Sequence, residues 1–218
     1  MVIFDCNGVL VDSELIAAEV LAEALGRIGL PVSIGAILRR YHGRRPADVL
    51  ASIEAAAQCK LPADFAAHLA AETLRRLRAE VRPVAHAAYT LTWIRGTKAV
   101  ASSAPRERIR ACLETTGLAR FFEGRLFSAS DVRLGKPAPD LLLLAAARCA
   151  VEPADCIVVE DSVPGVTAAV AAGMTPIGFV GGSHAPGQLA DDLLAAGARH
   201  VVADMRTLKS MVTELRGW

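Results

Sequence analysis

Four groups of polar residues with chemically useful side chains lie far apart in the sequence. They are Asp5, the hydroxyls Ser102 and Ser103, Lys136 in the run Gly135-Lys136-Pro137, and the acidic pair Glu160-Asp161. A carboxylate can attack a phosphate ester when the phosphate charge is neutralised, the attack is in line, and a metal ion bridges the two groups. These four groups could perform phosphoryl transfer if they gathered at one place, although none of them indicates it alone.

The runs that precede these residues predict where the side chains lie. Asp5 ends the apolar run Val2-Ile3-Phe4, which is typical of a buried parallel strand, and Glu160 ends a second run of this kind. Ser102 ends a third. Because open α/β sheets place their chemistry at the carboxyl ends of parallel strands, we expect the polar groups to meet in one crevice.

From Arg82 onward, short β-branched runs alternate with helical patterns. This alternation predicts right-handed crossovers and the α/β fold class, with a Rossmann-like, doubly wound parallel sheet whose central strand is at 2–5. The other expected strands cover 97–102, 125–128, 156–160, 176–180 and 200–203. The helices expected between them cover 87–95, 105–116, 138–150, 164–172 and 186–196.

The segment between the first strand and the rest of the sheet is helical throughout. Apolar residues recur at helical spacing over 14–29, 34–41, 46–59 and 63–81, and no strand signal interrupts them. We therefore expect an all-helical cap domain over residues 14–83, inserted into a core domain formed by residues 1–13 and 84–218.

The run Asp5-Cys6-Asn7-Gly8-Val9-Leu10-Val11-Asp12 resembles the nucleophile motif of the haloacid dehalogenase (HAD) superfamily of phosphatases. The order and spacing of the four polar groups also resemble the four motifs of that superfamily, over the whole expected core. One residue departs from the pattern, because the phosphatases of the family carry a second aspartate where this chain has Asn7. We interpret Cys6 as a core residue.

The resemblance implies a HAD-type phosphatase and a role for each motif. Asp5 would be the nucleophile that forms an aspartyl-phosphate. Ser102 would hydrogen-bond the transferring phosphoryl group, and Lys136 would offset the charges of nucleophile and phosphate. The alternatives are structural: serines can cap the helix that follows them, and a lysine can be a solvated loop charge.

The resemblance also implies a Mg²⁺ cofactor. Asp5, Asp161 and the main-chain carbonyl of Asn7 would hold the ion, and Glu160 would support it through water. Oxygen ligands and retained waters suit this small, hard cation. The alternative for Glu160-Asp161 is that the two acids cap the next helix.

The helical segment resembles the cap of the β-phosphoglucomutase and phosphoglycolate phosphatase branch, which closes over the substrate and selects it. That branch keeps a glycine-containing specificity loop where this chain has Tyr41 to Pro46. Gly43, Arg44 and Arg45 are therefore expected to bind substrate together with Ser103, the arginines through a carboxylate or a second phosphate. The alternative is an exposed polar turn. Gly181-Gly182-Ser183 is interpreted as a flexible loop, and Ser183 and His184 are adjacent and so poorly placed to act as a catalytic pair.

Asn7 weakens the expected chemistry. In the family, the side chain at this place protonates the leaving oxygen and then activates water, and an amide does neither. We expect intact Mg²⁺ and phosphate binding with slow turnover or a stalled aspartyl-phosphate.

Two alternative functions stay open, a mutase acting within one sugar phosphate and a catalytically silent phosphometabolite-binding protein. Dehalogenases have no use for the acidic pair, and phosphonate hydrolases need a cap lysine for which Lys60 is the only candidate.

Composition narrows the partners and the compartment. A net charge of +1 disfavours bulk nucleic-acid binding, and the longest apolar tract is too short to span a membrane. The five cysteines are odd in number and form no C-x-x-C pair, which indicates a reduced, cytoplasmic protein. The expected partner is a small-molecule, sugar-like phosphate ester, bound by a monomer or a weak homo-oligomer.

Overall fold

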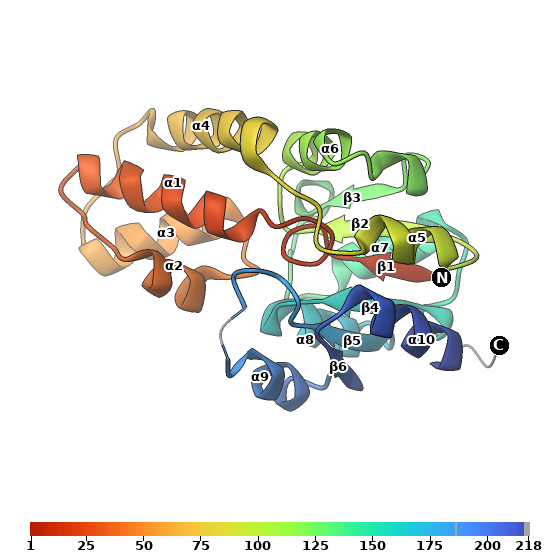
Figure 1. The fold of residues 1–218 in the computed structure, drawn as a ribbon. Coiled ribbons are helices and arrows are strands. Elements are labelled where there is room, and N and C mark those ends of the chain that lie inside the picture. The colour runs from red at the N-terminus through yellow and green to blue at the C-terminus, as the bar shows by residue number, and fades with distance from the viewer. Residues whose placement is uncertain (186, 216–218) are drawn as a thin grey trace.

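The computed structural model describes residues 1–185 and 187–215 and contains a six-stranded parallel sheet (Figure 1). The strand order is β3-β2-β1-β4-β5-β6, with β1 inside the sheet as predicted. The strands are β1 Val2–Phe4, β2 Lys98–Ser102, β3 Leu126–Ser128, β4 Ile157–Glu160, β5 Thr175–Phe179 and β6 His200–Val202. The predicted doubly wound α/β fold is confirmed.

Helices cover both faces of the sheet because successive residues of the central strand point to opposite sides. Val2 and Phe4 pack against one group of helices, and Ile3 packs against the other. The first group is α5 Ala87–Trp93, α6 Arg106–Thr115 and α10 Met205–Leu215. The second is α7 Asp140–Arg148 and α8 Val163–Ala171, with α9 Leu189–Ala195 packed beside α8. Short 3-10 turns lie at Ala119–Phe121, Ala129–Asp131 and Pro153–Asp155.

Two details at the C-terminal end differ from the sequence expectation. The helix expected at 186–196 begins at Leu189, and Pro186 lies outside the described residues. Helix α10 was not predicted at all. Its buried residues Met205, Leu208 and Val212 recur at helical spacing, so the pattern was present in the sequence.

Four helices form a lobe beside the carboxyl ends of the strands, at the left of Figure 1. They are α1 Glu14–Arg27, α2 Ile34–Tyr41, α3 Pro46–Ala57 and α4 Phe65–Glu80. The lobe has its own apolar cluster, which includes Leu25, Ile37, Ile53 and Phe65. The domain boundaries at residues 13 and 84 stay a prediction.

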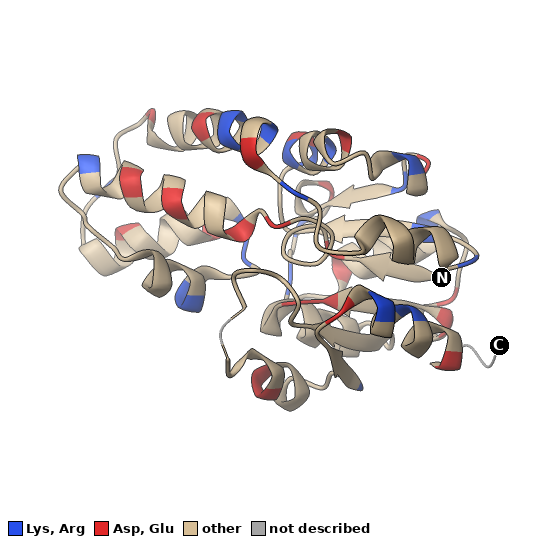
Figure 2. Cartoon of the chain, in the orientation of Figure 1, with Lys and Arg blue, Asp and Glu red and all other residues tan. Residues whose placement is uncertain are grey.

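Charged residues on the lobe form ion pairs between neighbouring helices. Arg76 on α4 contacts Glu19 on α1 and Glu80 on its own helix, each at 2.8 Å. Figure 2 shows both signs of charge intermixed along α4. Within the described residues, no helix has the length and apolar character needed to cross a bilayer.

Candidate active site

Asp5 lies immediately after the central strand, with 7% of its surface exposed. Its Oδ1 accepts a hydrogen bond from Lys136 Nζ at 2.6 Å, and its Oδ2 accepts one from the Asn7 main-chain N–H at 2.9 Å. Burial raises the pKa of Asp5; Lys136 opposes this shift, and the nearby Asp161 adds to it. A carboxylate in these surroundings is fixed in position and lies close to a second negative charge.

Lys136 joins the ends of three neighbouring strands. Its buried ammonium donates to Asp5 after β1, to the Ala101 carbonyl of β2 at 2.8 Å, and to Glu160 at the end of β4. Burial opposes the charged form, but Asp5 and Glu160 raise the pKa of Lys136 above its usual value. Lys136 is therefore a charged group held between two buried acids, and the alternative of a solvated loop charge does not describe it.

Ser102 and Asn7 lie side by side next to Asp5. The Ser102 hydroxyl is buried and lies 3.5 Å from Asn7 Nδ2, and it accepts a hydrogen bond from the Ala104 N–H at 3.4 Å. Asn7 Oδ1 accepts a hydrogen bond from Ser13 Oγ at 2.9 Å. The amide therefore occupies a defined position between two hydroxyls. Cys6 is fully buried in the core, and burial raises the pKa of its thiol.

Glu160 lies behind the lysine. Its Oε2 accepts a hydrogen bond from Ser162 Oγ at 3.1 Å, and the same hydroxyl accepts one from the Gly165 N–H at the start of α8. A Cβ atom at position 165 would collide with the Glu160 carboxylate, so the glycine leaves room for the acid. Ser162, rather than Glu160 or Asp161, is the residue that caps α8.

Asp161 is contacted by two histidines that the sequence analysis did not select. His42 Nε2 lies 3.1 Å from Asp161 Oδ2, and His184 Nε2 lies 3.0 Å from the same oxygen. Burial works to lower the pKa of His42, but Asp161 raises it to about 9. Burial likewise works to raise the pKa of Asp161, but His42 and His184 hold it below its usual range.

The two histidines come from different parts of the fold. His42 belongs to the loop between α2 and α3, and His184 lies after β5, next to the segment Gly181-Gly182-Ser183 that was interpreted as a flexible loop. No periodic pattern or spacing connects positions 42, 161 and 184 in the sequence. Only the folded chain brings them together.

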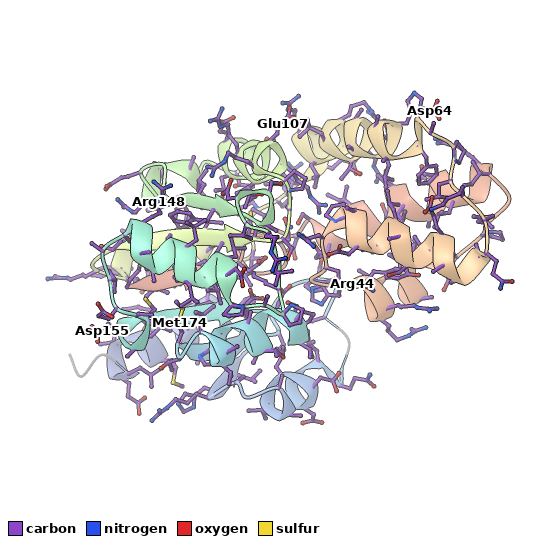
Figure 3. The ribbon with its side chains drawn as sticks, turned by 180° about the vertical axis from the view of Figure 1, so that it is seen from behind. Arg44, Asp64, Glu107, Arg148, Asp155 and Met174 are labelled. Carbon is purple, nitrogen blue, oxygen red and sulfur yellow. The ribbon has the colours of Figure 1, made fainter. Side chains whose placement is uncertain are left out.

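The loop from Tyr41 to Pro46 lies against the core. The Gly43 carbonyl accepts a hydrogen bond from Ser103 Oγ at 2.8 Å. Arg44 is on the side of the lobe that faces the core (Figure 3), and its guanidinium donates to Ser52 Oγ at 2.8 Å. Arg45 pairs with Asp48 and donates to the Arg133 carbonyl.

A cavity of about 320 Å³ extends from the carboxylates into the lobe. Asp5, Asn7, Asp161, Ser102, Ser103, Gly43 and Arg44 all line it. The other predicted site residues, Lys136, Glu160 and Arg45, are not among the lining residues. Aliphatic side chains of α1 to α4 form most of the remaining wall, and Glu14 and Arg108 add a charged pair separated by 3.7 Å. Glu14 and Arg108 were not selected from the sequence.

Replacing Gly43 by alanine is expected to destabilise the contact between loop and core. Gly43 has a φ of +76°, and a Cβ atom there would lie 2.5 Å from Ser162 Cβ and Oγ. Left-handed backbone alone costs a non-glycine residue about 1–2 kcal/mol. We expect urea unfolding to give a free energy of unfolding lower by at least that amount. The control is Gly26→Ala on α1, where an added Cβ atom would have no neighbour within 4 Å outside the nearby helix backbone, and alanine should stabilise the helix by up to about 1 kcal/mol. Equal shifts in the two variants would contradict the prediction.

The donor atoms around Asp5 and Asp161 fit a magnesium ion. Both side chains are buried carboxylates, and both line the same cavity. Asp161 raises the pKa of Asp5, which is the repulsion that a divalent cation between two acids would relieve. Oxygen donors are the ligands that Mg²⁺ takes.

A family model described as haloacid dehalogenase-like hydrolase matches residues 1–173. The chain belongs to this hydrolase family. One relative, the 6-phosphogluconate phosphatase of Escherichia coli K12, is 28% identical over 184 residues, which are 84% of this chain and 83% of the relative. The family membership and this phosphatase relative agree with the predicted HAD-type phosphatase.

Solved HAD structures have the same fold over nearly the whole chain. A conserved HAD-like protein of unknown function from Agrobacterium tumefaciens is 34% identical, with a TM-score of 0.85 and coverage of 99% of this chain and 98% of that chain. A putative β-phosphoglucomutase from Thermotoga maritima is 27% identical, with a TM-score of 0.73 and coverage of 98% of each chain. The predicted resemblance to the β-phosphoglucomutase branch is therefore confirmed.

Proposed function

We propose that this HAD protein is a Mg²⁺-dependent phosphomonoesterase that hydrolyses a small phosphate ester through an aspartyl-phosphate on Asp5. The observation that supports this most strongly is the buried Lys136, whose ammonium contacts Asp5 and Glu160 beside a cavity large enough for a small organic phosphate. A lysine in this position neutralises charge where a carboxylate must approach a dianion.

In the first step, the Asp5 carboxylate attacks phosphorus, and the bond from phosphorus to the ester oxygen breaks. Lys136 holds Asp5 in position, and the Ser102 hydroxyl donates a hydrogen bond to a phosphoryl oxygen. Asp5, Asp161 and the Asn7 carbonyl are the residues that would hold Mg²⁺, with Glu160 supporting them through water. When bound, the ion supplies charge neutralisation and in-line orientation.

The departing oxygen needs a proton, and the water that later cleaves the acyl-phosphate must lose one. Asn7 supplies neither transfer, because its amide is held by Ser13 and faces Ser102 without a titratable proton. Water must take both roles, so the proposed turnover is slow. Hydrolysis of the acyl-phosphate then regenerates Asp5 and releases inorganic phosphate.

The proposed substrate is a small phosphate ester of the sugar type, in keeping with the relative named as a 6-phosphogluconate phosphatase. The lobe side of the cavity adds a second candidate. Its wall includes Leu21, Ile37, Val49, Leu50 and Leu69, which favours a substrate with an apolar face. Alkyl and aryl phosphates are therefore tested beside sugar phosphates.

The test compares phosphate release by the parent and by Asp5→Asn, with Mg²⁺ and with a chelator. We expect slow release by the parent that depends on Mg²⁺, no release by Asp5→Asn, and a covalent adduct of one phosphoryl group on the parent in denaturing mass spectrometry. The control is Asp64→Asn, at the far end of the lobe (Figure 3), which should retain the parental rate. Undiminished release by Asp5→Asn would overturn the proposal.

The two remaining alternatives give different results in the same experiment. A mutase would convert one sugar phosphate into an isomer with little free phosphate. A phosphometabolite-binding protein would release no phosphate, form no adduct and still bind ligands.

A further inference from the structure

We propose that His42, His184 and Asp161 form a binding site for a transition-metal ion of the zinc class where the helical lobe meets the core. The site shares Asp161 with the proposed Mg²⁺ site but has different donors. It does not rest on catalytic turnover, because the two imidazoles and the carboxylate would bind the ion whether or not a phosphate ester is hydrolysed.

The distances between the donor atoms fit such an ion. Zinc bonds of about 2.0–2.1 Å in a tetrahedral site separate neighbouring ligand atoms by about 3.3 Å. His42 Nε2 and His184 Nε2 lie 3.1 and 3.0 Å from Asp161 Oδ2, and one donor atom from each residue lies within 4.8 Å of the others. The two nitrogen–oxygen separations are therefore close to those of a tetrahedral zinc site.

The chemistry of the donors selects the metal. Neutral imidazole nitrogens bind Zn²⁺, Co²⁺ and Ni²⁺, whereas Mg²⁺ prefers oxygen and keeps its waters. Two histidines and one carboxylate leave a fourth position open, as in zinc sites that bind water or a ligand. Asp161 lines the cavity next to Asp5, so a water or phosphate oxygen from that cavity could complete the coordination.

His184 provides the independent sign that a ligand is needed. Its side chain is 2% exposed; Nε2 contacts only Asp161 Oδ2, at 3.0 Å, and Nδ1 has no hydrogen-bond partner within the part of the chain that the structure describes. A buried polar group without a hydrogen-bond partner costs about 1–3 kcal/mol. A metal bond to Nε2 would give the nitrogen that faces Asp161 a bonding partner. It would thereby offset part of the cost of burying this imidazole.

The backbone around the site is shaped to hold these side chains. Gly8 has a φ of +73°, and a Cβ atom there would collide with Asp161 Oδ2 and with the His184 ring. A Cβ atom on Gly182 would lie 2.8 Å from the same ring. Two glycines therefore make room for two of the three ligands.

The ion would also join two parts of the molecule. His42 comes from the loop between α2 and α3, while Asp161 and His184 come from loops after β4 and β5. The rings of the two histidines lie 4.6 Å apart at their centroids. Bound metal would therefore hold the loop from Tyr41 to Pro46 against the core.

The test uses the intact chain, purified with a chelator and then freed of it. Zn²⁺ binding is measured by calorimetry, and Co²⁺ binding by its visible absorption, for the parent, His42→Ala, His184→Ala and the control His68→Ala. His68 is an exposed histidine on α4 with its own acidic neighbour, Asp64. We expect tetrahedral cobalt bands in the parent and His68→Ala. We also expect the Zn²⁺ affinity of each site variant to fall by more than about 100-fold. Loss of a residue that only supports a metal ligand costs about 10–100-fold, and loss of the ligand itself should cost more.

Two further measurements keep the outcome clear. Circular dichroism shows whether each variant is folded, and His42→Gln and His184→Gln replace any alanine variant that is not. A thiolate-to-cobalt charge-transfer band in the parent would assign the ion to a cysteine such as the exposed Cys59 and would overturn the proposal. Parental Zn²⁺ affinity in both site variants would overturn it as well. Because the readout is binding, failure here leaves the phosphate-release result unaffected, and the reverse also holds.

Discussion

Replacing Asn7 by aspartate is expected to raise the rate constant for phosphate-ester hydrolysis by about 10²–10⁴-fold. This is the usual contribution of a general acid–base group positioned at the reacting atoms. The amide now at position 7 already lies where that group is needed, next to Asp5 and Ser102. Because aspartate and asparagine have nearly the same shape, the substitution changes the proton chemistry of the site and little else.

The contacts of Asn7 favour a functional aspartate at this position. Ser13 Oγ donates to Asn7 Oδ1, and a carboxylate oxygen would accept the same hydrogen bond. The second oxygen would then face Ser102 and the cavity, where Nδ2 is now. The main-chain N–H of residue 7 would still donate to Asp5 Oδ2, so the nucleophile keeps its position.

The measurement is phosphate release by the parent, Asn7→Asp and Asn7→Ala on the substrate panel, with Mg²⁺ present. We expect Asn7→Asp alone to be faster, and we expect the acyl-phosphate adduct seen by mass spectrometry to be less abundant in it than in the parent. Equal rates in the parent and Asn7→Asp would show that residue 7 does not limit turnover. Asn-Gly steps deamidate, so each preparation is checked by mass spectrometry before the assay.

Sequence patterns predicted the fold because the strands are short apolar runs between helical segments, and the runs of β1, β2 and β4 end at a polar residue. Val2 to Phe4 are fully buried on both faces of the sheet, and such a run can be recognised without knowing its neighbours. The same logic placed Asp5 and Ser102 together, since parallel strands end at one edge, and Lys136 reaches that edge from the segment after β3. Their roles in catalysis stay predictions.

The histidines at Asp161 could not be found in this way. Each lies in an irregular loop, where position depends on tertiary contacts and no period marks the residue. Arg45 illustrates the same limit in the other direction. It stands beside Arg44 in the sequence, yet its guanidinium pairs with Asp48 and does not line the cavity.

Replacing Lys136 by methionine is expected to lower the free energy of unfolding by about 3–5 kcal/mol at pH 8. Removing one member of a buried ion pair leaves an uncompensated charge, and here two acids lose their common cation. Urea unfolding followed by circular dichroism measures the change. The control is Lys60→Met, whose ion pair with Glu54 is screened by solvent, so its loss should leave the free energy of unfolding nearly unchanged.

The loss should shrink as the pH falls, and the sign follows from proton binding. Burial already raises the pKa of Asp5, and raises that of Glu160 to about 8, above the unfolded values of about 3.9 and 4.3, and loss of Lys136 raises both further. Between the unfolded and the folded pKa values of these acids, the folded variant binds more protons than the unfolded chain. Its free energy of unfolding therefore falls as the pH rises through this range. Adding Glu160→Gln to Lys136→Met removes one of the unpaired charges and should restore part of the stability at pH 8. A loss that is independent of pH and unaffected by Glu160→Gln would mean that Lys136 stabilises the fold through packing rather than charge, and its proposed role at the nucleophile would lose its basis.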